Sequence, residues 1–232
     1  MDARAHEGEE ARAASIALGG TPRERLRVST RALTKLLRDP DDTRQVFLLG
    51  LTANRRAFPE FLARFAFERD GAELLASQPS IDSAAVDWAA LRAMPDGTLG
   101  REYVRYLDDN HLDPDLFQAP PGLPEIPSFV AKRLRQTHDI WHVLTGYAPD
   151  VPGEVALQGF TYAQTGMPSS ALIAVFGALR WMRRHPRLAR RTLDGYRRGK
   201  KASFLPVVKW EELWSRPVAE LRAELGIQPA QA

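Results

Sequence analysis

Two histidines and two carboxylates stand close together in the stretch HDIWHVLTGYAPDVPGE, residues 138–154. His138 and His142 are four residues apart, Asp139 lies between them, and Glu154 follows after eleven intervening residues. Imidazole and carboxylate are ligands that zinc, iron and manganese accept, whereas calcium prefers oxygen alone. Two carboxylates would also neutralise a divalent cation. The four residues therefore predict a site for one divalent metal ion.

The order of these residues is compatible with two helices joined by a turn. We expect one helix over 128–146, with its first serine as the N-cap and its last glycine as the stop. At about 100° per residue, His138, Asp139 and His142 fall within one arc of about 100°. The turn PDVPG then puts Glu154 near the start of a second helix, which can return it to the histidines. A pair of hydrogen-bonded histidines without a metal is the alternative.

Other metal chemistries fit these residues less well. Position 139 is Asp, so the zinc-protease motif HExxH is absent. A carboxylate-bridged di-iron centre needs a Glu-x-x-His motif from each of two helices, and the chain has no such pair of motifs. A phosphohydrolase using a His-Asp doublet needs a further His and Asp. His111, Asp150 and Asp194 are poor candidates by context, so this class ranks last.

A polar stripe follows the predicted ligand Glu154. Gln158, Thr161, Tyr162 and Thr165 recur at spacings of three and four residues, which places them on the side of Glu154. We therefore predict that these four residues contact the substrate. The other side of the same helix is apolar and should face the core.

Composition excludes several protein classes. The 232 residues suffice for one large domain, and the absence of cysteine excludes disulfides, thiolate metal sites, iron–sulfur clusters and a cysteine nucleophile. No run of 18 apolar residues predicts a membrane-spanning helix. The start of the chain lacks the apolar core of a secretory signal, and its acidic residues argue against a transit peptide. We expect residues 1–21 to be a mobile tail of a bacterial cytoplasmic protein.

The hydrophobic pattern predicts an all-α fold. Apolar residues recur at helical spacing in 28–39, 41–51 and 58–70, and period-two alternation is scarce. In the second of these segments, Asp41 and Asp42 are N-cap candidates.

Two further segments bear on the arrangement of the helices. Four prolines in 119–127 predict an extended loop within one domain. The segment 168–182 is apolar almost all round, which predicts a helix in the core or along an apolar cavity, with the core preferred.

Positive charge is concentrated near one segment. The net charge is +3, but eight arginines, two lysines and one aspartate give residues 180–201 a charge of +9. Such a zone suits an anionic membrane, although a solvated helix face is the alternative. Nucleic acid is disfavoured because only Trp181 and Tyr196 interleave as aromatic residues. We expect a helix beginning near Pro186. The arginines that we assign to membrane binding are Arg183, Arg184, Arg187, Arg190 and Arg191.

Three parts of the chain resemble a known family. They are MPDGTLGREYVRYLDDNHLDPD (94–115), THDIWHVLTGYAPDVPGEVALQGFTYAQTGMP (137–168), and RRGKKASFL (197–205) with KWEELWSRPVAELRAELGI (209–227). On these segments the chain resembles the coenzyme Q (ubiquinone) biosynthesis protein 4 family, as one domain over 22–228 with a tail at 229–232. The motif HDxxH, followed by eleven residues and Glu, is similar to the metal signature of that family.

The resemblance implies a fold, a ligand set and an activity. It implies a single helical domain with a two-helix metal site and an apolar lipid cavity. It implies a divalent metal, usually zinc, at His138, Asp139, His142 and Glu154, with Fe²⁺ and Mn²⁺ as alternatives. The implied reaction is oxidative decarboxylation at C1 of a polyprenylated benzoate, in which CO2 leaves and a hydroxyl group enters. A non-catalytic scaffold that binds polyprenyl lipid and organises a biosynthetic complex is the alternative.

The implied location and partners follow from the same resemblance. We expect a peripheral protein of the bacterial inner membrane, a homo-oligomer that contacts other ubiquinone biosynthesis proteins. The chain departs from the family after Glu154: where the family often has Lys and then Trp-Phe-Glu, this chain has Gln158, Gly159 and Thr161 around a matching Phe160. The departure removes a cation and an acid beside the expected metal.

Overall fold

Helices make up the regular structure of this chain. The computed structural model describes residues 16, 19–39, 43–116 and 124–230. Within these ranges it has no β-strand, and its one isolated bridge joins Thr98 to Pro217. The predicted all-α fold is thus confirmed.

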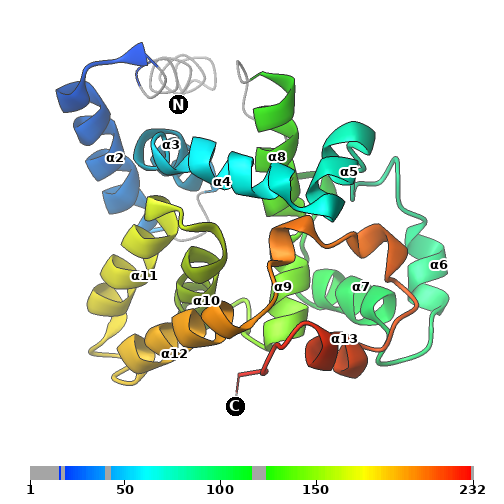
Figure 1. Ribbon diagram of the computed structural model, residues 1–232. Helices are drawn as coiled ribbons and strands as arrows, with labels where there is room; N and C mark the ends of the chain where they lie inside the picture. Colours follow the sequence, from blue (N-terminus) through cyan, green and yellow to red (C-terminus); the bar gives the residue numbers. More distant parts are fainter. Residues whose placement is uncertain (1–15, 17–18, 40–42, 117–123, 231–232) are drawn as a thin grey trace, which may run out of the picture.

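The helices are numbered in chain order (Figure 1). The α-helices are α2 (Pro22–Leu36), α3 (Thr43–Ala53), α4 (Ala57–Phe67), α5 (Arg69–Ser77), α6 (Trp88–Ala93), α7 (Leu99–Asp109), α8 (Glu125–Gln136), α9 (His138–Thr145), α10 (Val151–Thr165), α11 (Pro168–Trp181), α12 (Leu188–Lys201) and α13 (Val218–Glu224). Short 3-10 turns occur at η1 (Pro114–Leu116), η2 (Leu205–Val207) and η3 (Trp210–Glu212).

Helix α9 lies near the middle of the molecule, between α7 and α13 on one side and α10 and α12 on the other (Figure 1). Its residues Ile140, Trp141 and Leu144 are all buried in the largest hydrophobic core cluster. The same cluster includes Leu157 and Phe160 of α10, and the ring of Trp141 meets that of Phe160 edge-on at 6.1 Å. This packing holds α9 and α10 against each other.

The C-terminal end of α9 is capped from far along the chain. Its last carbonyl groups have no partner within the helix and need other donors. The guanidinium of Arg222 donates to the carbonyls of Val143 and Leu144, at 3.0 and 2.8 Å. The amide of Ala230 donates to the carbonyl of Thr145 at 2.6 Å. Arg222 and Ala230 therefore cap the C-terminal end of the helix that begins at His138.

The predicted helix over 128–146 is wrong in two respects. The chain instead forms α8 and α9, with Thr137 between them at φ −90° and ψ −7°. The helix also begins earlier than Ser128, whose amide already donates to the carbonyl of Pro124 at 2.9 Å. Ser128 is therefore inside the first turn and not an N-cap. Gly146 does end the helix, at φ 72°, as predicted.

The structure describes only part of the proline-rich segment 119–127. Residues 119–123 lie outside the described residues, as do Asp41, Asp42 and most of the predicted tail at 1–21. Residues 125–127 were expected to be extended, but they form the first turn of α8. Proline is tolerated in a first turn because the amide that it lacks would have no partner there.

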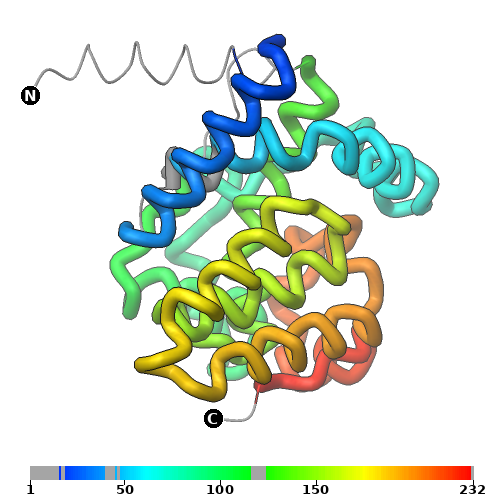
Figure 2. Tube along the Cα trace, turned by 90° about the vertical axis from the view of Figure 1, so that its left-hand side faces the viewer, coloured from blue at the N-terminus to red at the C-terminus, as the bar shows by residue number. Residues whose placement is uncertain are grey.

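Helices α10 and α12 cross at very short range, and the two views show them side by side (Figures 1 and 2). A Cβ atom on Gly195 would lie 2.4 Å from the carbonyl oxygen of Ala156, and one on Gly159 would lie 2.3 Å from that of Thr192. No real Cβ atom tolerates such distances to backbone. Glycine at both positions is therefore what allows the two helices to meet.

Helix α11 differs from the prediction. It was expected in the core, but its buried side carries small residues such as Ala174, Gly177 and Ala178. Its large residues Val175 and Leu179 are exposed. An apolar pattern on all sides of a helix does not show which side packs against the rest of the domain. The prediction that α11 lies in the core is therefore wrong for its outer side. None of the described helices is both long and apolar enough to cross a bilayer.

The close crossing of α10 and α12 makes a prediction about stability. Gly195→Ala should lower the free energy of unfolding by about 1–3 kcal/mol, because the methyl group forces the helices apart. Gly50→Ala on α3 is the matched control: its Cβ would meet nothing closer than 3.6 Å, so helix propensity should make it neutral or slightly stabilising. Denaturant unfolding measures both. Equal stability of the two variants would contradict the close approach.

Candidate metal centre

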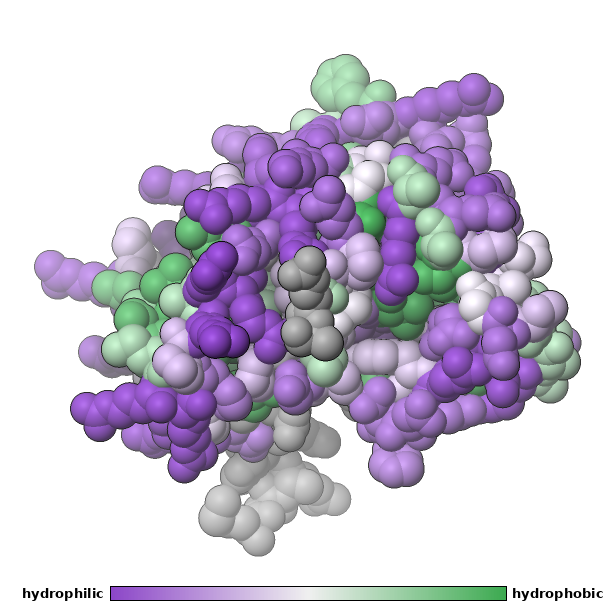
Figure 3. Space-filling model, turned by 90° about the horizontal axis from the view of Figure 1, so that it is seen from below, coloured by the Kyte–Doolittle hydropathy of each residue, from purple (hydrophilic) through white to green (hydrophobic). Residues whose placement is uncertain are grey.

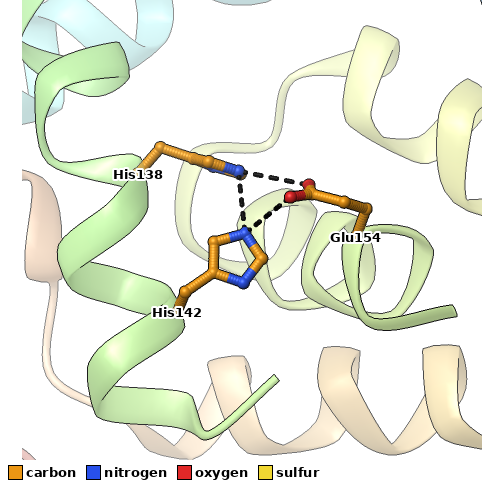
Figure 4. Close-up of side chains that lie close together, drawn as sticks. All are labelled: His138, His142 and Glu154. Carbon is orange, nitrogen blue, oxygen red and sulfur yellow. Dashed lines mark hydrogen bonds and ion pairs between the residues drawn. The ribbon is translucent and has the colours of Figure 1, made fainter. Parts of the chain in front are cut away.

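Three of the four predicted ligands converge on one point (Figure 4). One ligand atom from each of His138, His142 and Glu154 lies within 4.8 Å of the other two. His138 and His142 are one turn apart on α9, and Glu154 lies in the first turn of α10. The spacing of the sequence motif therefore produces a compact group, as predicted.

The carboxylate of Glu154 reaches both imidazoles. Its Oε1 is 2.9 Å from Nε2 of His142, and its Oε2 is 3.3 Å from Nε2 of His138. The two Nε2 atoms are 3.2 Å apart. Two ring nitrogens and a carboxylate that face one another across such distances form a donor set of the type that binds zinc and related metals.

The turn between α9 and α10 sets the position of Glu154. The side chain of Asp150 accepts a hydrogen bond from the amide of Gly153 at 2.8 Å and so caps α10. A Cβ atom on Gly153 would lie 2.0 Å from the carbonyl oxygen of Ala148, so only glycine fits this turn. The tight turn starts α10 directly beside the histidines.

A backbone hydrogen bond orients His142. Its Nδ1 is 2.9 Å from the carbonyl oxygen of Tyr147, which can only accept. Nδ1 therefore carries the proton in the neutral ring, and the lone pair of Nε2 is left for a metal. The ring of Tyr106 from α7 stacks on that of His142, with centroids 5.3 Å apart. Neither contact was predicted, because Tyr106 lies outside the motif and Tyr147 contributes its backbone carbonyl, which the side-chain pattern does not reveal.

Electrostatics couple the three residues. Burial favours the neutral form of Glu154, but hydrogen bonds and charge from His138 and His142 outweigh it and hold the pKa of this carboxyl far below its usual range. Burial likewise disfavours the imidazolium of His138, but hydrogen bonding and charge from Glu154 raise its pKa above the ordinary value. The carboxylate is therefore ionised and available as a ligand.

Asp139 is not part of the converging group. Its side chain is buried, and burial raises the pKa of its carboxyl. Burial, and after it the charge of Asp139, raises the pKa of Tyr103 and of Tyr106, so Asp139 lies near these two rings of α7. An offset of about 100° from His138 along the helix accounts for this different direction. The role of Asp139 as a fourth ligand stays a prediction.

The polar stripe of α10 divides between different surroundings. Tyr162 and Thr165 line a groove of about 340 Å³ between α4, α10 and α12. Tyr162 also stacks on Tyr196 of α12, with ring centroids 5.9 Å apart. Gln158 and Thr161 are half-buried, and the hydroxyl of Thr161 is buried without a hydrogen-bond partner. Their contact with a substrate stays a prediction.

The basic zone has a different shape from the one expected. The helix predicted to begin near Pro186 begins at Leu188, and a turn precedes it. Arg183, Arg184 and Arg187 therefore lie in the connection between α11 and α12. All five arginines assigned to membrane binding are exposed, the remaining two being on α12 itself.

Comparisons with known proteins give one consistent result. The model of the family "Coenzyme Q (ubiquinone) biosynthesis protein Coq4" matches residues 18–231. The mitochondrial ubiquinone biosynthesis protein COQ4 homolog of Xenopus tropicalis is 34% identical over 208 residues, which cover 89% of this chain and 74% of the relative. The human COQ4 homolog is 32% identical over 186 residues, which cover 78% and 70% of the two chains.

A solved structure extends the likeness to three dimensions. It is the crystal structure of a protein from Nostoc punctiforme that is described as a ubiquinone biosynthesis protein. The TM-score is 0.68 at 26% identity, and the match covers 85% of this chain and 96% of the other. The likeness confirms the helical fold over most of the chain.

The geometry of the site predicts how metal content responds to mutation. We expect purified protein to bind about one divalent ion per chain, because the group offers one set of ligands. His142→Ala should abolish binding, since it removes the ligand fixed by Tyr147. Asp139→Asn should weaken it. His185→Ala, an exposed histidine outside the group, is the matched control and should keep its metal.

Elemental analysis and isothermal titration measure these variants. Full occupancy in His142→Ala would show that the metal is bound elsewhere. Full affinity in Asp139→Asn would remove Asp139 from the predicted ligand set without affecting the other three.

Proposed function

The chain belongs to the Coq4 family of ubiquinone biosynthesis proteins, and we propose that it binds a polyprenylated benzoate at a divalent metal and carries out its oxidative decarboxylation. In this reaction the C1 carboxylate leaves as CO2 and a hydroxyl group takes its place. The observation that carries the proposal is the convergence of His138, His142 and Glu154 in a group that solvent can reach.

Accessibility favours a reactive site over a purely structural one. The side chain of His142 is fully buried, but those of His138 and Glu154 are 23% and 37% exposed. The group is therefore anchored from one side and open on the other. An open coordination position is typical of catalytic metal sites, whereas structural sites are closed.

The residues around the group would position a metal and a substrate. Zn²⁺ fits the donor set, and Fe²⁺ or Mn²⁺ accept the same ligands. A bound divalent metal would supply Lewis-acid stabilisation of the head-group carboxylate as its C–C bond breaks. The carbonyl of Tyr147 holds the His142 ring in its ligating tautomer, and we propose Asp139 as a fourth ligand. Exchange of carboxylate for hydroxyl needs an oxidant such as O2 or a partner protein.

The polar stripe would receive the rest of the substrate. We propose that Gln158, Thr161, Tyr162 and Thr165 contact it on the way from the site to the groove at the far end of α10. The groove begins about 12 Å from Glu154, from eight residues at the rise of an α-helix. The groove is lined by aromatic side chains, Tyr162 and Tyr196 among them, which would contact an isoprenoid chain, and also by the charged side chains of Glu60, Arg64 and Lys200.

A polyprenylated substrate resides in a bilayer, so we propose that the chain acts as a peripheral protein on the cytoplasmic face of a bacterial inner membrane. The exposed arginines near α12 give it an attachment to anionic lipid. A homo-oligomer and contacts with other ubiquinone biosynthesis proteins complete the proposed assembly.

The lipid component has a direct test. Organic extraction of the purified protein followed by mass spectrometry should yield an isoprenoid compound. Tyr162→Ala should retain less of it, because this side chain lines the groove. Leu193→Ala, an exposed apolar residue on α12 outside the groove, is the control. Extracts free of isoprenoid would leave the metal site without its proposed substrate.

The membrane component has a separate test. Replacing the five arginines at 183, 184, 187, 190 and 191 with Gln should abolish binding to anionic vesicles and leave metal content intact. Each basic residue near an anionic surface contributes about 1 kcal/mol, and salt screens it. Co-sedimentation with anionic and neutral vesicles, at low and high salt, measures the effect. Undiminished binding of the Gln variant would show that the basic zone is only a solvated surface.

A further inference from the structure

The outward side of α11 presents a continuous apolar stripe. Val175, Phe176, Leu179 and Met182 are 55%, 41%, 57% and 49% exposed. At about 100° per residue, these four positions, the last of which is the C-cap of α11, span an arc of about 120° on one side of the helix. We call them the α11 stripe.

The α11 stripe is not needed to attach α11 to the domain. The helix is held on its opposite side, where Gly177 packs so closely that an added Cβ would lie 2.6 Å from a methyl group of Val155. Small residues thus serve the internal contact, while the large residues face outward. Large contiguous apolar patches are uncommon on soluble monomers and mark surfaces for a partner or a membrane.

Positive charge lies beside the C-terminal end of the α11 stripe. Arg180 lies at one edge, and Arg183, Arg184 and Arg187 follow in the connection to α12, all exposed. The guanidinium groups of Arg180 and Arg184 lie 5.1 and 5.4 Å from the ring of Trp181. On the left of Figure 3, the side where Figure 1 shows α11, apolar residues lie among hydrophilic ones.

The α11 stripe has two possible partners, a second copy of the chain and a lipid bilayer, and the positive charge beside it distinguishes between them. A two-fold contact through the α11 stripe would bring two sets of arginines together, and like charges repel. Anionic head groups instead complement them, and a helix that combines apolar side chains with an arginine-rich border is typical of an element that lies in a membrane interface.

We infer that the α11 stripe inserts into the interface of an anionic bilayer while the neighbouring arginines contact lipid phosphates. The inference rests on the proposed role at a lipid surface, and adds apolar insertion to electrostatic attachment. It also orients the site, because Gly177 of this helix packs on Val155, the residue next to Glu154. The docking helix thus lies against the helix that carries a predicted metal ligand.

The test replaces apolar side chains and keeps every arginine. Phe176→Gln with Leu179→Gln should weaken binding to vesicles of phosphatidylcholine and phosphatidylglycerol by about tenfold or more, because their burial in the interface is lost. Leu26→Gln with Phe67→Gln is the matched control, since both residues are exposed apolar residues outside α11. This control should bind like the native chain.

A probe measures insertion directly. The chain has no cysteine, so Phe176→Cys and Ala219→Cys on α13 can each carry a single environment-sensitive fluorophore. Addition of the vesicles should shift the emission to the blue at position 176 and leave position 219 unchanged.

The outcomes separate this inference from the proposed function. If the Phe176/Leu179 variant binds normally while the variant with five Gln replacements does not, attachment is electrostatic only, and the inference is overturned while the membrane role stands. If the Phe176/Leu179 variant changes only the oligomeric state in sedimentation velocity, the α11 stripe is a contact between copies, which also overturns it.

Discussion

The hydrogen bond between His142 and the carbonyl of Tyr147 is the contact on which the site depends. It fixes the imidazole tautomer and at the same time holds the chain that leaves α9 against the helix. The turn that follows is tight enough to require Gly153, and Asp150 caps the helix that begins there. One short connection therefore sets the orientation of the His142 ring and the position of Glu154. A looser loop would leave Glu154 free to move away from the histidines.

The surrounding core makes that connection rigid. α9 is buried on several sides, by α7, by α10 and by the last helix of the chain. Because packed interiors resist small displacements, α9 and α10 have little freedom to shift relative to each other. The close crossing of α10 and α12 adds to this rigidity, because glycine at the contact lets the two helix backbones pack directly against each other. The exposed side of the site, at His138 and Glu154, is therefore carried by tightly packed helices.

Local patterns predicted the parts of this structure that depend on local interactions. Spacing alone was enough to bring His138, His142 and Glu154 together, and Gly146 as a helix stop followed from its freedom to adopt positive φ. The interruption at Thr137 was missed because apolar residues keep helical spacing on both sides of it. The stacking of Tyr106 on His142 joins residues far apart in sequence, which one sequence read without relatives does not reveal. The exposed side of α11 was missed because a helix that is apolar all round gives no signal for which side is buried. The small residues of α11 could have indicated its buried side.

The capping of α9 by Arg222 and Ala230 gives the chain an order of maturation. These bonds close loops of more than seventy residues, and long loops close late in folding because their entropy must be lost first. During synthesis the histidines leave the ribosome well before the residues that complete their helix. A chain stopped short of α13 would therefore carry the whole motif on a helix whose last turn is not secured.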